Sequence, residues 1–328
     1  MSETPSRTAA LAPDAPHDAA HDAAPDAAAN PLRSTHLSFV GAGAMAEAMI
    51  AGLLRRGLVG PEQITGSHPR AARRRELQTR YGIAVTESNR EAAAAALSAP
   101  GDGRGEGASP PAGGGASAGG VSRSVVVLAV KPQRLGGVLR ELRGALAPEQ
   151  LALSIVAGAR METISGELLH PAVVRAMPNT PAQVGEGMTA WTPSPPVTQE
   201  QEAEVRAVLG ALGREMRVEN ENMIDMATAL SATGPTYIFM MMEALVDAGV
   251  HMGFSRHVAQ ELVTQTMLGS VLFARESGKH PAELRNMVTS PGGTSAEAIY
   301  QMEKGSLRTV LSKAVYAAYQ RAVALGRK

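Results

Sequence analysis

Residues 37–57 combine a short apolar strand, a glycine-rich turn and a helical run, and few folds accommodate this order. LSFV is the strand, GAGAMA is the turn, and EAMIAGLLRRG continues with helical spacing. In a dinucleotide-binding unit, Gly41 permits the tight turn, Gly43 lets backbone amides approach a pyrophosphate, and Ala46 allows close packing of helix on strand. The phosphate then lies at the N-terminus of the helix. A purely structural turn is the alternative, but the flanking strand and helix favour a cofactor loop.

Further strand-like runs follow, with helical patterns between most of them, at 63–67, 83–86, 124–130, 151–157, 172–177 and 213–220. Strands that alternate with helices predict an α/β domain with a doubly wound, Rossmann-type parallel sheet. The run SVVVLAV at 124–130 is apolar throughout, as expected of a central strand buried on both faces. Lys131 follows this strand at the edge where open α/β sheets bind ligands. It is a candidate for contact with a phosphate or the nicotinamide ribose, and a solvated lysine is the alternative.

The end of the second strand indicates the type of cofactor. NAD enzymes normally carry an acidic residue there for the ribose 2′-hydroxyl, whereas residues 63–75 contain no Asp or Glu. Ser67, Arg70 and the arginines at 73–75 supply donors that suit a 2′-phosphate, which favours NADP. Ser67 and Arg70 lie nearest the strand end and are the best candidates. A solvated basic helix face explains some of the other arginines.

After residue 220 the strand pattern gives way to helical patterns. The first helical run, about 222–249, is interrupted at Gly234-Pro235, and a proline inside a helix forces a kink or a restart. A restart exposes backbone amides beside the hydroxyls of Ser231 and Thr233. These groups predict a small anion site.

A second junction, SPGGTSAE at 290–297, begins another helix. Thr294 is the expected N-cap, with Glu297 three residues later completing a capping box. Gly292 and Gly293 let the backbone approach a ligand closely. Capping alone explains Thr294 and Glu297 but not the adjacent glycines and proline, so a ligand site is favoured over a plain turn.

Two more helices are expected, from Ser255 to Gly278 and over about 306–325. The helices of this half are rich in apolar residues and cannot bury them within one thin layer. Dimerisation through these helices is therefore predicted. The expected domains are a sheet domain at 35–219 and an all-helical substrate-binding and dimerisation domain at 220–328.

Two segments are expected to be disordered. Residues 1–34 alternate Ala, Pro, Asp and His without the apolar core of a signal peptide, and 97–122 is a Gly/Pro/Ser-rich insertion in the sheet domain. His17 and His21 have helical metal-ligand spacing, but this acidic tail offers no rigid frame, and no metal site is predicted.

The composition excludes several classes of function. A formal net charge of zero gives no sign of a nucleic-acid footprint or a basic membrane-binding face. The 328 residues include no cysteine, which excludes disulfides and thiolate metal sites and favours a reducing, cytoplasmic compartment. The longest apolar stretch is interrupted by Gly, Pro, Glu and Asp, so no transmembrane span is expected.

Taken in order, these motifs resemble those of the pyrroline-5-carboxylate reductases, from about Leu37 to the C-terminus. The matching segments are FVGAGAMAEA, AVKPQ, SIVAG, RAMPNTPAQVGEG, ALSATGPTYIF, HPAEL and TSPGGTS. The resemblance implies NADPH-dependent reduction of 1-pyrroline-5-carboxylate to L-proline, with NADH as an alternative donor. It also implies an interlocked helical homodimer, rings of such dimers, and active sites that combine the sheet domain of one subunit with the helices of its partner.

The resemblance also assigns roles to individual residues. The pyrophosphate would contact Gly41, Ala42, Gly43, Ala44, Met45 and Ala46; Ser67 would lie by the 2′-phosphate, Asn89 by the adenosine, and Ala129, Val130 and Lys131 by the nicotinamide. The substrate carboxylate would be held by Ser231, Thr233 and Gly234 together with Gly292, Gly293 and Thr294. Hydride transfer to a cyclic imine needs alignment more than a strong protein acid, so no essential His or Lys is expected.

Two substitutions depart from the family pattern, and two other functions compete with this one. Ala232 replaces a usual glycine, and Thr236 is bulkier than the usual alanine. A 3-hydroxyacid dehydrogenase would need a lysine on a helix, but the lysines after residue 220 lack the matching glycine-rich context. A non-catalytic NADP-binding relative is the second alternative.

Overall fold

The computed structural model describes residues 30–95 and 123–326. The predicted insertion, most of the predicted N-terminal tail, and His17 and His21 within it lie outside these ranges. The sequence predicts that residues 30–34 belong to the tail, but the structure places them in a turn against the sheet domain, where Leu32 is fully buried. Through this buried leucine, the sheet domain includes residues before 35.

The sheet domain is built on an eight-stranded sheet with the order β3-β2-β1-β4-β5-β6-β7-β8. The strands are β1 Thr35–Val40, β2 Ile64–Ser67, β3 Ala84–Thr86, β4 Arg123–Leu128, β5 Leu151–Ser154, β6 Val173–Met177, β7 Gly187–Pro193 and β8 Gly213–Arg217. The predicted doubly wound sheet is confirmed, and its strands from β3 to β6 are all parallel. Strand β7 was not predicted and pairs antiparallel with β6, so the far edge of the sheet is mixed.

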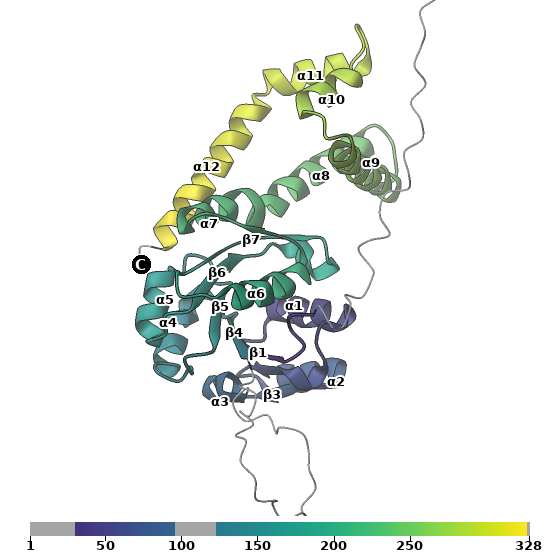
Figure 1. Cartoon of the computed structure of the whole chain (residues 1–328). Helices are drawn as coiled ribbons and strands as arrows, with labels where there is room; N and C mark the ends of the chain where they lie inside the picture. The colour runs from purple at the N-terminus through teal and green to yellow at the C-terminus, as the bar shows by residue number, and fades with distance from the viewer. Residues whose placement is uncertain (1–29, 96–122, 327–328) are drawn as a thin grey trace, which may run out of the picture.

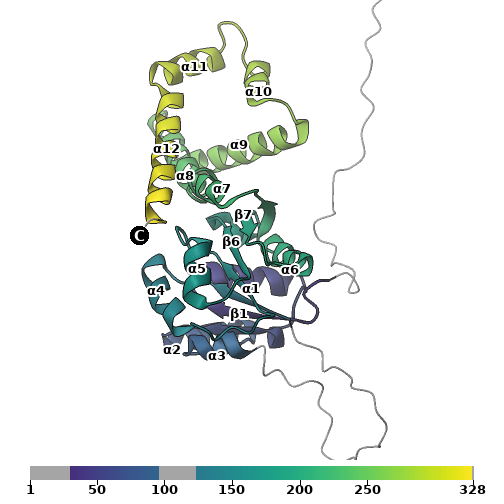
Figure 2. The same ribbon diagram turned by 60° about the vertical axis from the view of Figure 1, so that its left-hand side comes forward.

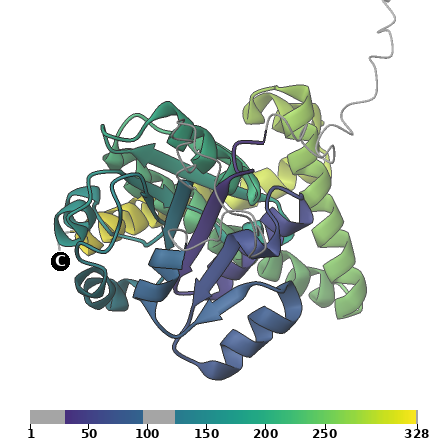
Figure 3. The same cartoon turned by 60° about the horizontal axis from the view of Figure 1, so that its bottom comes forward.

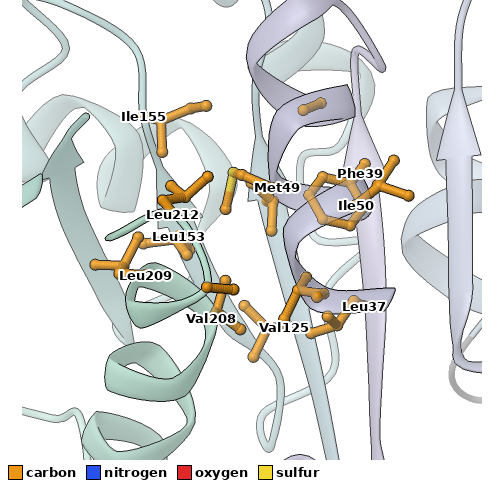
Figure 4. Packing of buried hydrophobic residues seen from close by; sticks show 14 of the residues in the cluster. Leu37, Phe39, Met49, Ile50, Val125, Leu153, Ile155, Val208, Leu209 and Leu212 are labelled. Carbon is orange, nitrogen blue, oxygen red and sulfur yellow. The ribbon is translucent and has the colours of Figure 1, made fainter. Parts of the chain in front are cut away.

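Helices cover both faces of this sheet (Figures 1 and 3). They are α1 Ala44–Arg55, α2 Ala71–Tyr81, α3 Asn89–Ala94, α4 Pro132–Glu141, α5 Met161–Leu168 and α6 Gln199–Gly210, with short turns η1 Pro61–Gln63 and η3 Thr180–Val184. Strand residues alternate between two cores: Val125 and Val127 face α1 and α6, whereas Val126 and Leu128 face α4 and α5. Figure 4 shows the first core, in which Met49 of α1 packs among strand residues.

The second half of the described chain is helical, as predicted. Its elements are α7 Glu221–Ala227, η4 Thr228–Ala232, α8 Gly234–His251, α9 Arg256–Ser277, α10 Pro281–Met287, α11 Thr294–Lys304 and α12 Leu307–Leu325. Helices α8 to α11 form an open frame that stands away from the sheet, and α12 returns from the far end to pack against α7 and η4 (Figures 1 and 2).

Large apolar side chains lie exposed along this frame in one chain. Phe239, Met240, Val271, Val310 and Tyr316 are each more than half exposed. A surface of this extent is typical of a protein interface, and none of the residues that the structure describes covers it. Among the described residues, no helix combines the length and the hydropathy needed to cross a membrane.

Candidate functional site

The glycine loop lies at the point where the strand order of the sheet reverses. It follows β1, which lies between β2 and β4. Strands β2 and β3 extend the sheet on one side of β1, and β4 to β8 extend it on the other. Gly41 has a φ of +88°, and a Cβ added to it would lie 2.5 Å from Cγ1 of Val130 at the end of β4. A Cβ added to Gly43 would meet no atom closer than 4.0 Å, so the loop is open on that side. Such a crevice is where doubly wound sheets bind dinucleotides.

Helix α1 begins directly in this crevice, with Gly43 as its N-cap. The amide of Glu47 makes the first intrahelical hydrogen bond, to the Gly43 carbonyl at 2.9 Å. The preceding amides of Ala44, Met45 and Ala46 therefore have no helical partner, which is the usual condition of a first turn. Three unpaired amides and the positive end of the helix fit a pyrophosphate, in agreement with the predicted loop.

Ser67, at the end of β2, forms a hydrogen bond with the glycine loop. Its hydroxyl accepts from the Gly41 amide at 3.2 Å and donates to Oδ1 of Asn89 at 2.7 Å. Nδ2 of Asn89 in turn donates to Glu141 at 2.7 Å, which fixes the orientation of the amide. Ser67 is fully buried, so in this conformation it positions the loop and Asn89 and does not face a 2′-phosphate.

The basic residues after β2 have different surroundings. Arg73 binds Glu47 and the Ala42 carbonyl, and Arg74 binds the carbonyls of His68 and Pro69, so both hold the protein together. Arg70 is the exposed N-cap of α2, and its backbone amide donates to Nδ1 of His68. Of the two best candidates for the 2′-phosphate, Arg70 is therefore the one with an accessible side chain.

His68 lies beside these arginines at the end of β2, and the sequence patterns did not identify it. Partial burial and the nearby positive charge of Arg70 lower the pKa of His68, with smaller effects from Arg73 and Arg74. Burial and the neighbouring cations therefore favour the neutral form of this imidazole. Its place directly after Ser67 at the strand end was the signal that could have identified it.

The residues predicted to lie by the nicotinamide follow the end of β4. The Ala129 amide donates to the Val40 carbonyl at 2.9 Å, and Val130 packs over Gly41. Lys131 is the exposed N-cap of α4. The three residues predicted for the nicotinamide side therefore lie beside the glycine loop.

The Gly234-Pro235 interruption takes the form of a π-helical turn. η4 occupies residues 228–232, and the Thr233 amide donates to the Thr228 carbonyl at 2.9 Å. The Thr233 hydroxyl donates to the same carbonyl at 2.9 Å, so its proton is already used within the turn. π-Turns inside helices occur frequently at functional sites.

Ser231 is partly exposed in this turn and meets the sheet domain. Nδ2 of Asn179, in the loop after β6, lies 3.4 Å from both the hydroxyl and the carbonyl oxygen of Ser231. Ala232 has a negative φ, so the glycine usual in the family is not needed for this backbone. Thr236 is exposed, and its larger side chain does not disturb the packing of the turn.

The second junction differs from the prediction. Gly293, and not Thr294, is the N-cap of α11, and no side-chain capping bond forms there, so the predicted capping box is wrong. Pro291 and Gly292 form the centre of a type II turn, in which the Gly293 amide donates to the Ser290 carbonyl at 3.0 Å and Gly292 has a φ of +70°. This turn brings Gly293 to the cap position and leaves Thr294 exposed in the first helical turn.

The two predicted substrate segments are far apart within one chain. Ser231 lies beside the sheet, whereas the turn between α10 and α11 lies at the opposite end of the helical frame in both Figure 1 and Figure 2. A single chain therefore does not assemble Ser231 and Thr294 into one pocket.

Comparisons with known proteins match both halves of the chain. Residues 221–325 match the family model described as pyrroline-5-carboxylate reductase dimerisation, and residues 36–97 match the model described as NADP oxidoreductase, coenzyme F420-dependent. The pyrroline-5-carboxylate reductase of Synechocystis sp. is 38% identical over 295 residues, which are 90% of this chain and 100% of the relative.

Two solved structures give the same result in three dimensions. A pyrroline-5-carboxylate reductase from Coxiella burnetii has a TM-score of 0.76 at 32% identity, covering 90% of this chain and 100% of its own. A pyrroline carboxylate reductase from Plasmodium falciparum, solved with NADP bound, has a TM-score of 0.73 at 28% identity, covering 89% and 98%.

Proposed function

The chain belongs to the pyrroline-5-carboxylate reductase family, and from that membership we propose that it reduces 1-pyrroline-5-carboxylate to L-proline with NADPH. The observation that carries the proposal is the match to the Synechocystis enzyme over that enzyme's whole length, which includes the cofactor crevice and the dimerisation helices. NADP is the cofactor class, and Arg70 beside the end of β2, with no carboxylate in 63–75, supports NADPH as the preferred donor.

When bound, NADPH supplies a hydride to the imine carbon, and the imine nitrogen gains a proton to become the secondary amine of proline. The first-turn amides of α1 would hold the pyrophosphate, and the end of β4 would support the nicotinamide. Because the protein must mainly align the two reactants, no strong protein acid is needed.

The substrate carboxylate is proposed to bind donors at the two helix junctions. The Ser231 hydroxyl and the Thr294 hydroxyl are the side-chain donors. Thr233 donates its proton to Thr228, so it contributes by shaping the π-turn. Gly234, Gly292 and Gly293 let the backbone approach the ligand.

We propose that each substrate pocket forms between subunits. The dimerisation match and the exposed apolar frame support a homodimer. The separation of Ser231 from Thr294 within one chain supports a pocket that takes one junction from each subunit. Assembly of dimers into a larger ring and a cytoplasmic location stay predictions, the first tested by light scattering on the purified protein.

The remaining alternative is a relative that binds NADPH without turning over substrate. Oxidation of NADPH by the purified protein, followed at 340 nm with and without 1-pyrroline-5-carboxylate, separates the two. We expect oxidation that depends on the imine and yields proline. Folded protein that binds NADPH but shows no such oxidation would exclude the enzymatic function.

A further inference from the structure

Asn179 lies where the sheet domain meets the proposed substrate segment, and none of the roles assigned above includes it. It follows β6 by two residues and precedes the turn η3. Its Oδ1 accepts from the Met188 amide at 2.9 Å. Because a backbone amide can only donate, this contact places the carbonyl oxygen of the side chain toward Met188 and its NH₂ group toward Ser231.

This orientation determines how the Ser231 hydroxyl can act. The Asn179 NH₂ group donates to the hydroxyl oxygen and occupies one of its lone pairs. The hydroxyl proton is then free to donate to a different acceptor, and a carboxylate oxygen is a strong one. Thr233, which also lies in this segment, has its proton bound to Thr228 and lacks this freedom.

Helix α7, which leads directly into η4, is joined to the sheet domain by ion pairs. Arg175 on β6 is buried, and it binds Asp225 at 2.7 Å and Glu221 at 3.0 Å, both on α7. Arg160 binds the second carboxylate oxygen of Asp225 at 2.9 Å. Strand β6 and the loop after it thus contact α7 through Arg175 and η4 through Asn179, which fixes Ser231 relative to the sheet.

We propose that Asn179 is a positioning residue for the reduction: it orients the Ser231 hydroxyl as a donor to the substrate carboxylate. The inference rests on the proposed function, because the carboxylate it invokes is that of the cyclic imine. Asn179 acts through Ser231 and not on the reacting atoms.

The test uses two variants of Asn179 and a control in the full-length protein. Asn179→Ala removes the contacts with Met188 and Ser231, whereas Asn179→Asp keeps an acceptor for the Met188 amide and loses the donor to Ser231. Gln183→Ala removes an exposed amide from the same loop that makes no hydrogen bond to Ser231 or Met188, and it serves as the control. KM and kcat for the imine, the Kd for NADPH and the melting temperature are measured for each.

We expect Asn179→Ala to raise KM for the imine by about tenfold or more, the effect of losing one hydrogen-bonded orientation toward a charged group. Asn179→Asp should raise KM further, because it adds a negative charge near the substrate carboxylate, and it should keep the wild-type melting temperature. The Kd for NADPH should be unchanged in both, and Gln183→Ala should match the wild type throughout. A purely structural role predicts the reverse order, with Asp restoring the wild-type KM, and that result would overturn the inference.

A double-mutant cycle with Ser231→Ala tests the route of the effect. If Asn179 acts through Ser231, adding Asn179→Ala to Ser231→Ala should change KM by less than about twofold. Multiplicative effects of the two substitutions on KM would contradict the proposal. Wild-type protein that neither oxidises NADPH with the imine nor binds L-proline in calorimetry would reject the proposed function and this inference together, whereas an active wild type with an unaffected Asn179→Ala would reject the inference alone.

Discussion

Gly41 has the strictest steric requirement in the cofactor loop, because two independent features exclude a side chain there. Its φ of +88° is unfavourable for L-residues, and its added Cβ would lie 2.5 Å from Val130. We expect Gly41→Ala to lower the free energy of unfolding by at least about 1–2 kcal/mol and to weaken NADPH binding. Urea unfolding and NADPH titration measure the two effects.

The matched control is Gly137→Ala in α4. Gly137 is exposed within a helix, and a Cβ added to it meets no atom within 4 Å. This variant should gain up to about 1 kcal/mol from helix propensity. If both alanine variants changed stability in the same direction, the steric account of Gly41 would be wrong.

Glu204 is a buried carboxyl group of α6, and we expect its ionisation to reduce stability at neutral pH. Its removal from water raises its pKa, and the hydrogen bond from Thr35 and the charge of Arg123 only partly oppose this. A raised pKa in the folded state means that the stability present below the unfolded pKa is lost as pH rises through the folded value. Glu204→Gln keeps an acceptor for Thr35 and removes the charge.

We therefore expect Glu204→Gln to stabilise the protein by on the order of 1 kcal/mol at pH 8. The advantage should shrink as pH falls toward the ordinary pKa of a glutamate, because the buried wild-type carboxyl with its raised pKa takes up its proton first. Melting curves across this range, compared between the two proteins, measure the difference. A difference that stayed constant with pH would show that the charge of Glu204 is not its cause.

At the scale of elements, we propose that the N-terminal end of α2 binds the 2′-phosphate of the cofactor through the side chain of Arg70. Arg70→Ala should raise the KM for NADPH by about tenfold or more, the effect of losing one hydrogen bond to a charged group, and should change the KM for NADH little. Arg214→Ala removes an exposed arginine from β8, at the opposite edge of the sheet, and is the control. Equal losses with NADPH and NADH would remove Arg70 from cofactor selection.

The elements that sequence could predict are those with a clear local signal. Glycine turns, apolar strand runs and capped helices placed β1, β4, α1 and α9 correctly, and Ser255 caps α9 through the Val258 amide as expected. Strand β7 was missed because GMTAWTP contains a glycine, two buried threonines and a terminal proline, and thus has neither alternation nor a continuous apolar run. Tertiary pairing with β6 and β8 decides its conformation.

The sequence identifies the segments that form the candidate site, but it does not identify the hydrogen-bond partners of individual side chains. The partners of Ser67 and Thr233 depend on distances between elements, which no local pattern contains. Thr294 had the composition of a capping box, but the type II turn at Pro291-Gly292 moves the cap back to Gly293. At Thr233, a hydrogen bond within the π-turn occupies the hydroxyl proton that was expected to bind the substrate. At Thr294, the turn places a different residue at the cap position.

For the whole molecule, the separation of Ser231 from Thr294 in one chain leads to a complementation experiment. Ser231→Ala and Thr294→Ala should each reduce kcat/KM by an amount consistent with about 1.5–3 kcal/mol, one hydrogen bond to a charged group. If a pocket combines Ser231 of one subunit with Thr294 of its partner, a mixed dimer contains one pocket with both substitutions and one with neither.

Unfolding the two variants together and refolding them at equal concentrations should therefore restore about a quarter of wild-type activity, because half of the dimers are mixed and half of their pockets are intact. Each variant refolded alone should stay at its own reduced rate, which controls for refolding losses. Pockets built within a single chain would give no recovery, since every pocket in the mixture would then lack one hydroxyl. Recovery is thus a direct measure of whether the exposed helical frame joins two chains into one active site.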